Sequence, residues 1–165
     1  MLTLMMFDSP IGPLQLYARG DALAGLYLPN RGPDLGVPQG SSPVLVRAAT
    51  QLAEYFSGNR ATFDLPLDGE GTEFQRKVWQ ALLDIPFGEV RSYAQIANAI
   101  GQPTASRAVG AANGKNPISI IVPCHRVIGS SGQLVGYGGG KPTKQWLLEH
   151  EQNHSGRGQR AFALG

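Results

Sequence analysis

Cysteine and histidine are scarce in this 165-residue sequence, which contains one cysteine, Cys124, and three histidines, His125, His150 and His154. A single cysteine cannot form an internal disulfide, and the sequence has no paired ligand spacing of a structural zinc site. No stretch approaches the roughly 18 apolar residues of a transmembrane helix, and the first residues lack the pattern of a signal peptide. We therefore expect a cytoplasmic protein that holds no metal and does not enter a membrane.

Charge is small overall but unevenly distributed. Residues 1–70 contain 4 Lys and Arg against 7 Asp and Glu, a balance of −3, and residues 71–165 contain 10 against 5, a balance of +5. A basic half of this kind indicates either contact with a polyanion or a solvated basic surface. Hydrophobic residues make up 42% of the sequence, enough for the core of one domain or two small ones.

The first half has the pattern of a small α/β domain. Apolar residues alternate with polar ones over the first 30 residues, which predicts strands joined by turns. Ser42, followed by proline, is a good helix N-cap, and Gly58 closes that helix. Residues 63–67 predict a short strand, and the Asp- and Gly-rich segment 68–71 marks a domain boundary.

Helix signals become stronger after that boundary. Thr72 and Gln75 have the spacing of a capping box, and the sequence 86–88, Pro-Phe-Gly, ends the helix that follows. A further helix is expected over about Thr143 to Gln152.

Two short helices, over 92–100 and from Thr104 to about Ala112, have the pattern of a helix-turn-helix. The second helix is built almost entirely of small residues, with Arg107 as its one long side chain. Major-groove recognition needs several long polar side chains, so a thin helix is better suited to a minor groove, where it would bind with little sequence preference. The alternative is that the small residues allow tight helix packing and that Arg107 is a surface charge.

The apolar run 118–122 predicts a buried strand that Pro123 ends, placing Cys124 where the strand emerges. Neighbouring His125 could lower the pKa of the thiol, although a lone cysteine can equally be an inert buried residue. Adjacent residues of a strand point to opposite faces, so contact between this thiol and the imidazole would need a turn or a water. Either Glu149 or Glu151 could orient the histidine.

The glycine-rich segment 136–141 is not a phosphate-binding loop. Val135 occupies the position of the first glycine of that motif, and Pro142 replaces the Ser or Thr after the lysine. We expect instead a loop that lets a bulky substrate approach the backbone. His150 and His154 are expected on the surface.

Residues 123–127, Pro-Cys-His-Arg-Val, preceded by Asn-Pro at 116–117 and followed by the glycines of 136–140, resemble the O6-alkylguanine-DNA alkyltransferases. The similarity covers residues 72 to about 151, and the first half matches in outline, most clearly at 8–12. The resemblance implies a ribonuclease H-like α/β domain over 1–70 and a mainly α winged helix-turn-helix domain over 71–165.

The resemblance further implies that Cys124 accepts an alkyl group irreversibly from O6 of a damaged guanine in duplex DNA, in one turnover and without a cofactor. O4-alkylthymine is a second candidate substrate, and side-by-side binding of several molecules on one duplex is a further expectation. The target base would be flipped out of the helix through the minor groove.

Individual roles follow from the same resemblance. His125 takes the thiol proton through a water, Glu151 polarises His125, and Asn116 supports the turn beneath the site. Arg107 fills the gap left by the flipped nucleotide, and Tyr93 rotates its phosphate. Further DNA contacts are expected from Ser92, Thr104, Ala105, Ser106, Ala108 and Gly110. The guanine pocket is expected to comprise Tyr93, Val122, Cys124, Val127, Tyr137, Gly138 and Lys144. Arg157 and Arg160 are candidates for additional phosphate contacts.

Two other classes of function stay open at this point. A non-enzymatic module that marks lesions would bind alkylated DNA without covalent change, and a cysteine hydrolase would turn over repeatedly on an ester or amide. Cys124 argues against the non-catalytic members of the family, which lack this cysteine. Some members bind a structural zinc in the first domain, but residues 1–90 contain neither cysteine nor histidine, so zinc is not expected here.

Overall fold

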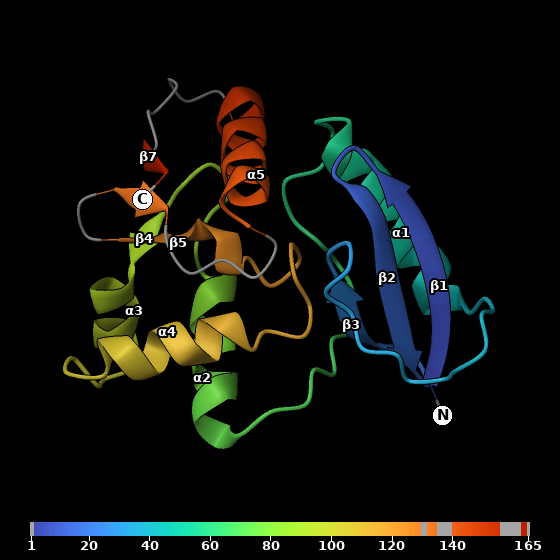
Figure 1. Cartoon of the computed structure of the whole chain (residues 1–165), viewed down its shortest axis with the longest axis horizontal. Coiled ribbons are helices and arrows are strands. Elements are labelled where there is room, and N and C mark those ends of the chain that lie inside the picture. The colour runs from blue at the N-terminus through green and yellow to red at the C-terminus, as the bar shows by residue number, and fades with distance from the viewer. Residues whose placement is uncertain (1, 130–131, 135–139, 156–162, 165) are drawn as a thin grey trace. The chain divides into compact units, whose positions relative to one another are not determined.

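The computed structural model describes residues 2–129, 132–134, 140–155 and 163–164. The chain divides into two compact units (Figure 1). The first comprises Met1–Glu70 and Pro117–Ile121, and the second comprises Gly71–Asn116 and Val122–Gly165. The second unit is therefore not the continuous segment 71–165 that the sequence suggested, because five residues within it belong to the first unit.

The first unit contains an antiparallel sheet of three strands in the order β1-β2-β3. They span Leu2–Ser9, Gly12–Arg19 and Ala22–Tyr27, so the strands expected in the first 30 residues are confirmed. Gly20 has a φ of 58° in the turn between β2 and β3, a left-handed conformation that glycine adopts without steric cost.

The outer edge of β3 pairs with two short segments instead of a fourth strand. Leu23 accepts from Asp68 N and donates to Pro66 O, both at 2.8 Å. Leu26 donates to Pro117 O at 2.9 Å and accepts from Ser119 N at 3.0 Å. These bonds satisfy backbone groups that would otherwise be left unpaired at the sheet edge.

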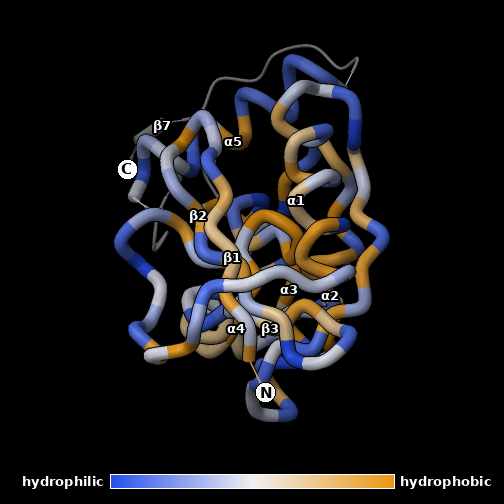
Figure 2. Tube along the Cα trace, turned by 90° about the vertical axis from the view of Figure 1, so that its right-hand side faces the viewer, coloured by the Kyte–Doolittle hydropathy of each residue, from blue (hydrophilic) through white to orange (hydrophobic). Residues whose placement is uncertain are grey.

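Helix α1, Pro43–Phe56, covers this sheet and begins and ends where the sequence predicted. The Ser42 side chain accepts a hydrogen bond from Leu45 N, and Gly58 beyond the helix has a φ of 84°. Hydrophobic and polar residues alternate along the α1 tube in Figure 2. The buried residues of the helix are Val44, Leu45, Ala48, Gln51, Leu52 and Tyr55.

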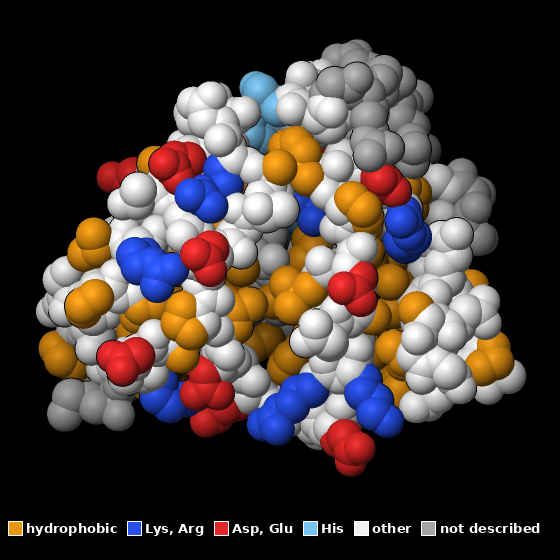
Figure 3. Space-filling model, turned by 180° about the vertical axis from the view of Figure 1, so that it is seen from behind, with side chains coloured by type: hydrophobic (Ala, Val, Ile, Leu, Met, Phe, Trp, Pro, Cys, Tyr) orange, Lys and Arg blue, Asp and Glu red, His pale blue; other side chains and the backbone are white. Residues whose placement is uncertain are grey.

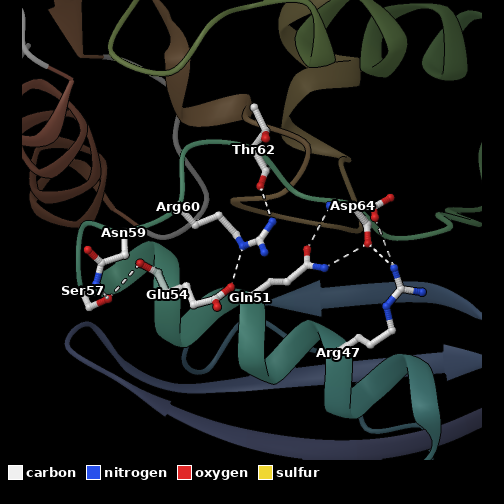
Figure 4. A network of polar contacts seen from close by, with 8 residues as sticks. All are labelled: Arg47, Gln51, Glu54, Ser57, Asn59, Arg60, Thr62 and Asp64. Carbon is white, nitrogen blue, oxygen red and sulfur yellow. Dashed lines mark hydrogen bonds and ion pairs between the residues drawn. The ribbon is translucent and has the colours of Figure 1, made fainter.

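The predicted strand over 63–67 does not form, because α1 uses the backbone of this segment (Figure 4). Buried Gln51 donates to Asp64 O at 3.0 Å and accepts from Asp64 N at 2.9 Å, as a neighbouring strand would. Pro66 has no N–H to offer to a sheet. A single bridge, between Leu67 and Leu23, remains of the expected strand.

The second unit is mainly helical. Its helices are α2 (Glu73–Leu83), α3 (Tyr93–Ala99), α4 (Ser106–Gly114) and α5 (Lys141–His154), with a 3-10 turn, η1, at Cys124–Arg126. Four two-residue strands form two parallel pairs: β4 (Arg91–Ser92) with β5 (Val127–Ile128), and β6 (Gln133–Leu134) with β7 (Ala163–Leu164).

Helix starts in this unit were predicted well where a side chain caps them. The capping box of Thr72 and Gln75 is present at α2, and Ser92 caps α3 in the same way. Helix α4 was expected from Thr104, but it begins after Ala105 and has no side-chain cap. It also runs two residues beyond the expected end at Ala112, because its last turn is held by tertiary hydrogen bonds.

No helix of the described part of the chain is long and apolar enough to cross a membrane. The face seen in Figure 3 carries Lys and Arg interspersed with Asp and Glu. The charge asymmetry of the sequence is therefore not visible as a surface of one sign on this face.

Candidate active site

The segment that leads to Cys124 is a series of turns and not the predicted strand. Ile118 makes one bridge, to Leu26, and Ile120 has a φ of 72°. Ile121 N donates to Ser119 O at 2.8 Å, which closes a tight turn around Ile120. Apolar character alone indicated burial correctly here, but not the extended conformation.

A second tight turn places the cysteine. Pro123, with φ −82° and ψ 65°, is the centre of an inverse γ-turn closed by the 2.8 Å bond from Cys124 N to Val122 O. Cys124, His125 and Arg126 then form the turn η1. Neither Cys124 nor His125 therefore lies on a strand, and of the two arrangements that the sequence left open, a turn or a water, the structure contains the turn.

Two asparagine side chains hold the backbone on either side of Pro123. Asn116 donates to Val122 O at 2.8 Å, and Asn113 donates to Cys124 O at 3.3 Å. All of these residues are buried, Cys124 with 5% of its surface exposed. The sequence analysis did not single out Asn113, which lies in the last turn of α4, directly before Gly114 ends the helix.

His125 is fully buried, and its Nε2 lies 2.6 Å from Oε2 of Glu151 on α5. The choice left open between two glutamates falls on Glu151, because Glu149 is exposed and accepts from Gln145. Burial lowers the pKa of His125, with the neighbouring Glu151 acting in the opposite direction. The second ring nitrogen, Nδ1, is buried without a hydrogen-bond partner among the described residues.

Arg126 completes this cluster; the sequence indicated it only as a positive charge near the thiol and not as a partner of Glu151. Its Nε donates to Glu151 Oε1 at 2.8 Å and its Nη2 to Oε2 at 3.1 Å, while Nη1 donates to Ile85 O at 2.7 Å. Burial alone would raise the pKa of Glu151, but the charges and hydrogen bonds of His125 and Arg126 hold it far below its ordinary value. Glu151 is therefore ionised in the folded protein.

Lys144 and Tyr93 are coupled electrostatically to the cysteine. Lys144, on α5, is fully buried and donates to Val127 O. Burial lowers its pKa to about 8, partly opposed by the charge that Cys124 can carry. Burial also raises the pKa of Tyr93, and the same Cys124 charge adds to the effect. The structure thus brings both expected pocket residues into the field of the thiol.

The thin helix α4 presents small residues and one arginine to solvent. Arg107 and Ala108 are exposed, as is Thr104 ahead of the helix, whereas Ala105, Ser106 and Gly110 are half-buried. Gly110 is next to Tyr93: a Cβ at this glycine would lie 3.7 Å from the tyrosine ring. The small residue at position 110 therefore lets the helix pack close to the Tyr93 ring. Of the remaining expected contacts, Ser92 is half-buried, Val127 is fully buried, and Tyr137, Gly138, Arg157 and Arg160 lie outside the described residues.

The sequence from His150 to His154, His-Glu-Gln-Asn-His, matches a zinc-binding helix pattern that the sequence analysis did not consider. Its glutamate, Glu151, is turned into the core and bound by Arg126. His150 is buried, contrary to expectation, and stacks on Trp146 with ring centroids 4.9 Å apart. The described residues contain no cluster of three potential metal ligands, so the pattern does not form a metal site there.

Comparison with known proteins gives matches over nearly the whole chain. Residues 3–69 match the ribonuclease-like domain, and residues 73–153 the DNA-binding domain, of 6-O-methylguanine DNA methyltransferase. A methylated-DNA–protein-cysteine methyltransferase of Mycobacterium bovis is 53% identical over 157 residues, which cover 90% of this chain and 91% of the relative.

Solved structures agree with this match. The crystal structure of Mycobacterium tuberculosis O6-methylguanine methyltransferase superimposes with a TM-score of 0.86 at 49% identity, covering 93% of this chain and 94% of the other. A structure of the M. tuberculosis protein in complex with DNA gives a TM-score of 0.85 at 50% identity, covering 93% of each chain. The ribonuclease-like and DNA-binding folds expected for the two halves are thereby confirmed.

Proposed function

This chain belongs to the 6-O-methylguanine DNA methyltransferase family, and from that membership we propose that it repairs alkylated duplex DNA by taking the alkyl group onto Cys124. The substrate is O6-alkylguanine, with O4-alkylthymine as a second candidate. The observation that carries the proposal is the buried arrangement of Cys124 directly before His125, whose imidazole is bound by ionised Glu151.

The chemistry is an in-line displacement at the alkyl carbon. The thiol proton passes through a water to Nδ1 of His125, the ring nitrogen not engaged by Glu151. The thiolate of Cys124 then forms a sulfur–carbon bond while the carbon–O6 bond breaks, and the electron pair that remains on guanine takes up the proton that His125 accepted, returned through the water. A thioether is not hydrolysed by water, so the protein acts once and needs no cofactor. Lys144 lies in the field of the thiolate and stabilises it.

Access to O6 requires that the damaged nucleotide leave the base stack, which costs a few kcal/mol. The small exposed residues of α4 fit a minor groove closely, and Arg107 enters the stack in place of the flipped base. Tyr93, at the start of α3, rotates the adjoining phosphate in this proposal. Asn116 keeps the turn before Cys124 in shape through its bond to Val122 O.

The decisive test incubates the protein with a duplex that carries one O6-methylguanine and maps the products by mass spectrometry. We expect one methyl group on the peptide that contains Cys124, in a stoichiometry of one per protein, and restored guanine in the DNA. Cys124→Ala should bind the same duplex without any transfer. Intact DNA binding without methylation of wild-type Cys124 would favour a lesion-binding module, and repeated turnover on an ester would favour a hydrolase.

Replacing Arg107 tests the base-flipping step. Arg107→Ala should slow transfer from duplex DNA by about tenfold or more, because nothing then offsets the cost of unstacking. Transfer from free O6-methylguanine, where no stack exists, should be unchanged. A matched control is Arg76→Ala, an exposed arginine of α2. Equal losses on the duplex and on the free base would rule out a stack-filling role.

A further inference from the structure

The hydrogen bonds of Arg126 within the buried cluster indicate a role for this residue in the reaction. We propose, resting on the function proposed above, that Arg126 is a positioning residue which neutralises Glu151, so that His125 rests uncharged and ready to accept the proton of Cys124. The arginine acts on His125 through the carboxylate of Glu151. Unlike the carboxylate of an ordinary buried ion pair, the carboxylate that Arg126 binds is also bound by the histidine beside Cys124.

The guanidinium uses all three of its nitrogens. Two of them grip both oxygens of Glu151, the fork geometry that arginine makes with carboxylates, and the third donates to Ile85 O ahead of β4. The Phe87 ring lies 5.8 Å from Cζ on the same turn. Arg126 is 6% exposed, so solvent screens the pair very little. Arg126 thus fixes the orientation of the Glu151 carboxylate and balances its charge, independently of the contact between Glu151 and His125.

A buried glutamate paired with histidine alone would draw a proton onto the imidazole and form an ion pair. A protonated imidazole cannot accept the thiol proton, and the cysteine would then stay a weak nucleophile. The charged groups that face His125 are Glu151 and Lys144 on α5 and Arg126 on its own turn. Burial is the largest influence that lowers the pKa of His125, and Arg126 and Lys144 lower it further. Because Arg126 donates to both oxygens of Glu151 and lowers the pKa of His125 more than Lys144 does, its loss is expected to have the larger effect.

The proton balance of the step follows. Before the proton leaves Cys124, the site holds a thiol, a neutral imidazole and a Glu151–Arg126 pair without net charge. After the proton has passed to His125, the site holds a thiolate and an imidazolium, and Glu151 stabilises the new positive charge through the 2.6 Å contact to Nε2. In the resting site, Arg126 therefore makes Glu151 less able to hold a proton on the His125 imidazole. It leaves in place the carboxylate that stabilises the imidazolium once this has formed.

Two substitutions separate charge from shape. Arg126→Met removes the charge and keeps an unbranched side chain, whereas Arg126→Lys keeps the charge and loses the fork. Methyl transfer from an O6-methylguanine duplex is followed under single-turnover conditions across the pH range from mildly acidic to mildly alkaline. The ionisation of His125 is followed separately, without DNA, by nitrogen NMR of the imidazole. Arg76→Met serves as the control for loss of one positive charge.

We expect neutral His125 near neutral pH in the wild type and in Arg126→Lys. In Arg126→Met the titration of His125 should move upward, with transfer slower by about tenfold for each pH unit of that move and recovering as the pH is raised. A uniform loss at every pH, or a wild-type His125 that is protonated near neutral pH, would overturn the proposal. If Arg126→Met does not fold, the wild-type and Arg126→Lys titrations still decide, since protonated His125 in either would contradict it.

Failure of the underlying function gives a different result. In that case wild-type Cys124 gains no methyl group, while the NMR titrations of His125 are unaffected and still test the electrostatic part. If wild-type transfer occurs and the two arginine variants share its pH profile, the repair function stands and the role of Arg126 is wrong.

Discussion

Each unit of the protein contains an arginine–carboxylate network, and the two differ chiefly in exposure. On α1 and the segment after it, Nη2 of Arg47 lies 3.6 Å from the carboxylate oxygen Oδ2 of Asp64, and the two side chains are 50% and 93% exposed (Figure 4). In the second unit Arg126 lies 2.8 Å from Glu151, with side chains 7% and 1% exposed. Exposed pairs contribute 0 to about 1 kcal/mol to stability, whereas a buried charge left without its partner costs several kcal/mol.

The comparison indicates what each network is for. The α1 network fastens a segment of irregular backbone, and its essential member is the neutral amide of Gln51, which bonds both backbone groups of Asp64. In our proposal the buried network instead sets the charge state of His125 beside Cys124. Removing single members should therefore have graded effects, large in the second unit and small in the first.

The largest effect is expected for Glu151→Gln. This change leaves Arg126 buried without a counter-charge and should lower the free energy of unfolding by about 3–5 kcal/mol. Methyl transfer should fall to near background, because the imidazolium loses its stabilising carboxylate. Urea unfolding and single-turnover kinetics measure the two effects. A decrease in the free energy of unfolding of less than about 1 kcal/mol would show that the Arg126–Glu151 pair contributes no more than an exposed ion pair.

The same variant gives a pH signature. Because the pKa of Glu151 is held below its ordinary value of about 4.5, its ionised form stabilises the fold above that pH, and this contribution is lost as the pH falls. Wild-type stability should therefore decline in acid more steeply than that of Glu151→Gln. Parallel curves would show that the carboxylate is not specially stabilised.

Lys144 should produce an effect of the opposite direction in alkali. Burial lowers its pKa to about 8 from an ordinary 10.5, so above pH 8 the unfolded chain holds the proton that the folded protein has released. The free energy of unfolding should then rise with pH over that interval, by at most about 3 kcal/mol. Lys144→Met, with a side chain of similar length, should lack this rise. The difference between the two urea-unfolding series isolates the lysine.

In the first unit, Gln51→Ala should cost about 1–3 kcal/mol, since it leaves the N–H of Asp64 without its protein partner and the C=O of Asp64 with Arg47 alone. Methyl transfer should be unchanged once folding is allowed for. Thermal unfolding together with the transfer assay checks both statements. A changed transfer rate at equal folded fraction would contradict the separation between the networks.

Arg47→Ala should have the smallest effect, under about 1 kcal/mol, because its ion pair with the Asp64 carboxylate is exposed and open to salt screening, and Gln51 still donates to the Asp64 carbonyl that Arg47 would release. Unfolding at low and at high salt measures it. A loss as large as that of Gln51→Ala would show that the ion pair, and not the amide, holds the segment.

Features encoded locally could be predicted from the sequence. Ser42, Thr72 and Ser92 each cap a helix within three residues of themselves, and those helix starts were correct. The turn at Gly20 was equally local. Such signals depend only on residues close in the chain, so they can be recognised from one sequence without knowledge of distant partners.

Features that depend on distant partners were missed. The run 118–122 has strand composition, yet tight turns and pairing with β3 set its conformation. The choice between Glu149 and Glu151 depends on which side of α5 faces η1. Asn113 and Arg126 stood next to residues already singled out, but their partners lie 11 and 25 positions away. The family resemblance supplied Glu151; it did not supply these two.

The five residues of Pro117–Ile121 have a consequence for biosynthesis. A ribosome releases residues 1–70 well before this segment exists, so the first unit emerges with the Leu26 backbone groups of β3 still unsatisfied. An open strand edge is a template for association between nascent chains. A fragment ending at Glu70 should therefore aggregate more readily than the whole chain, and light scattering with and without an added peptide of residues 117–121 would measure the protection that the late segment provides.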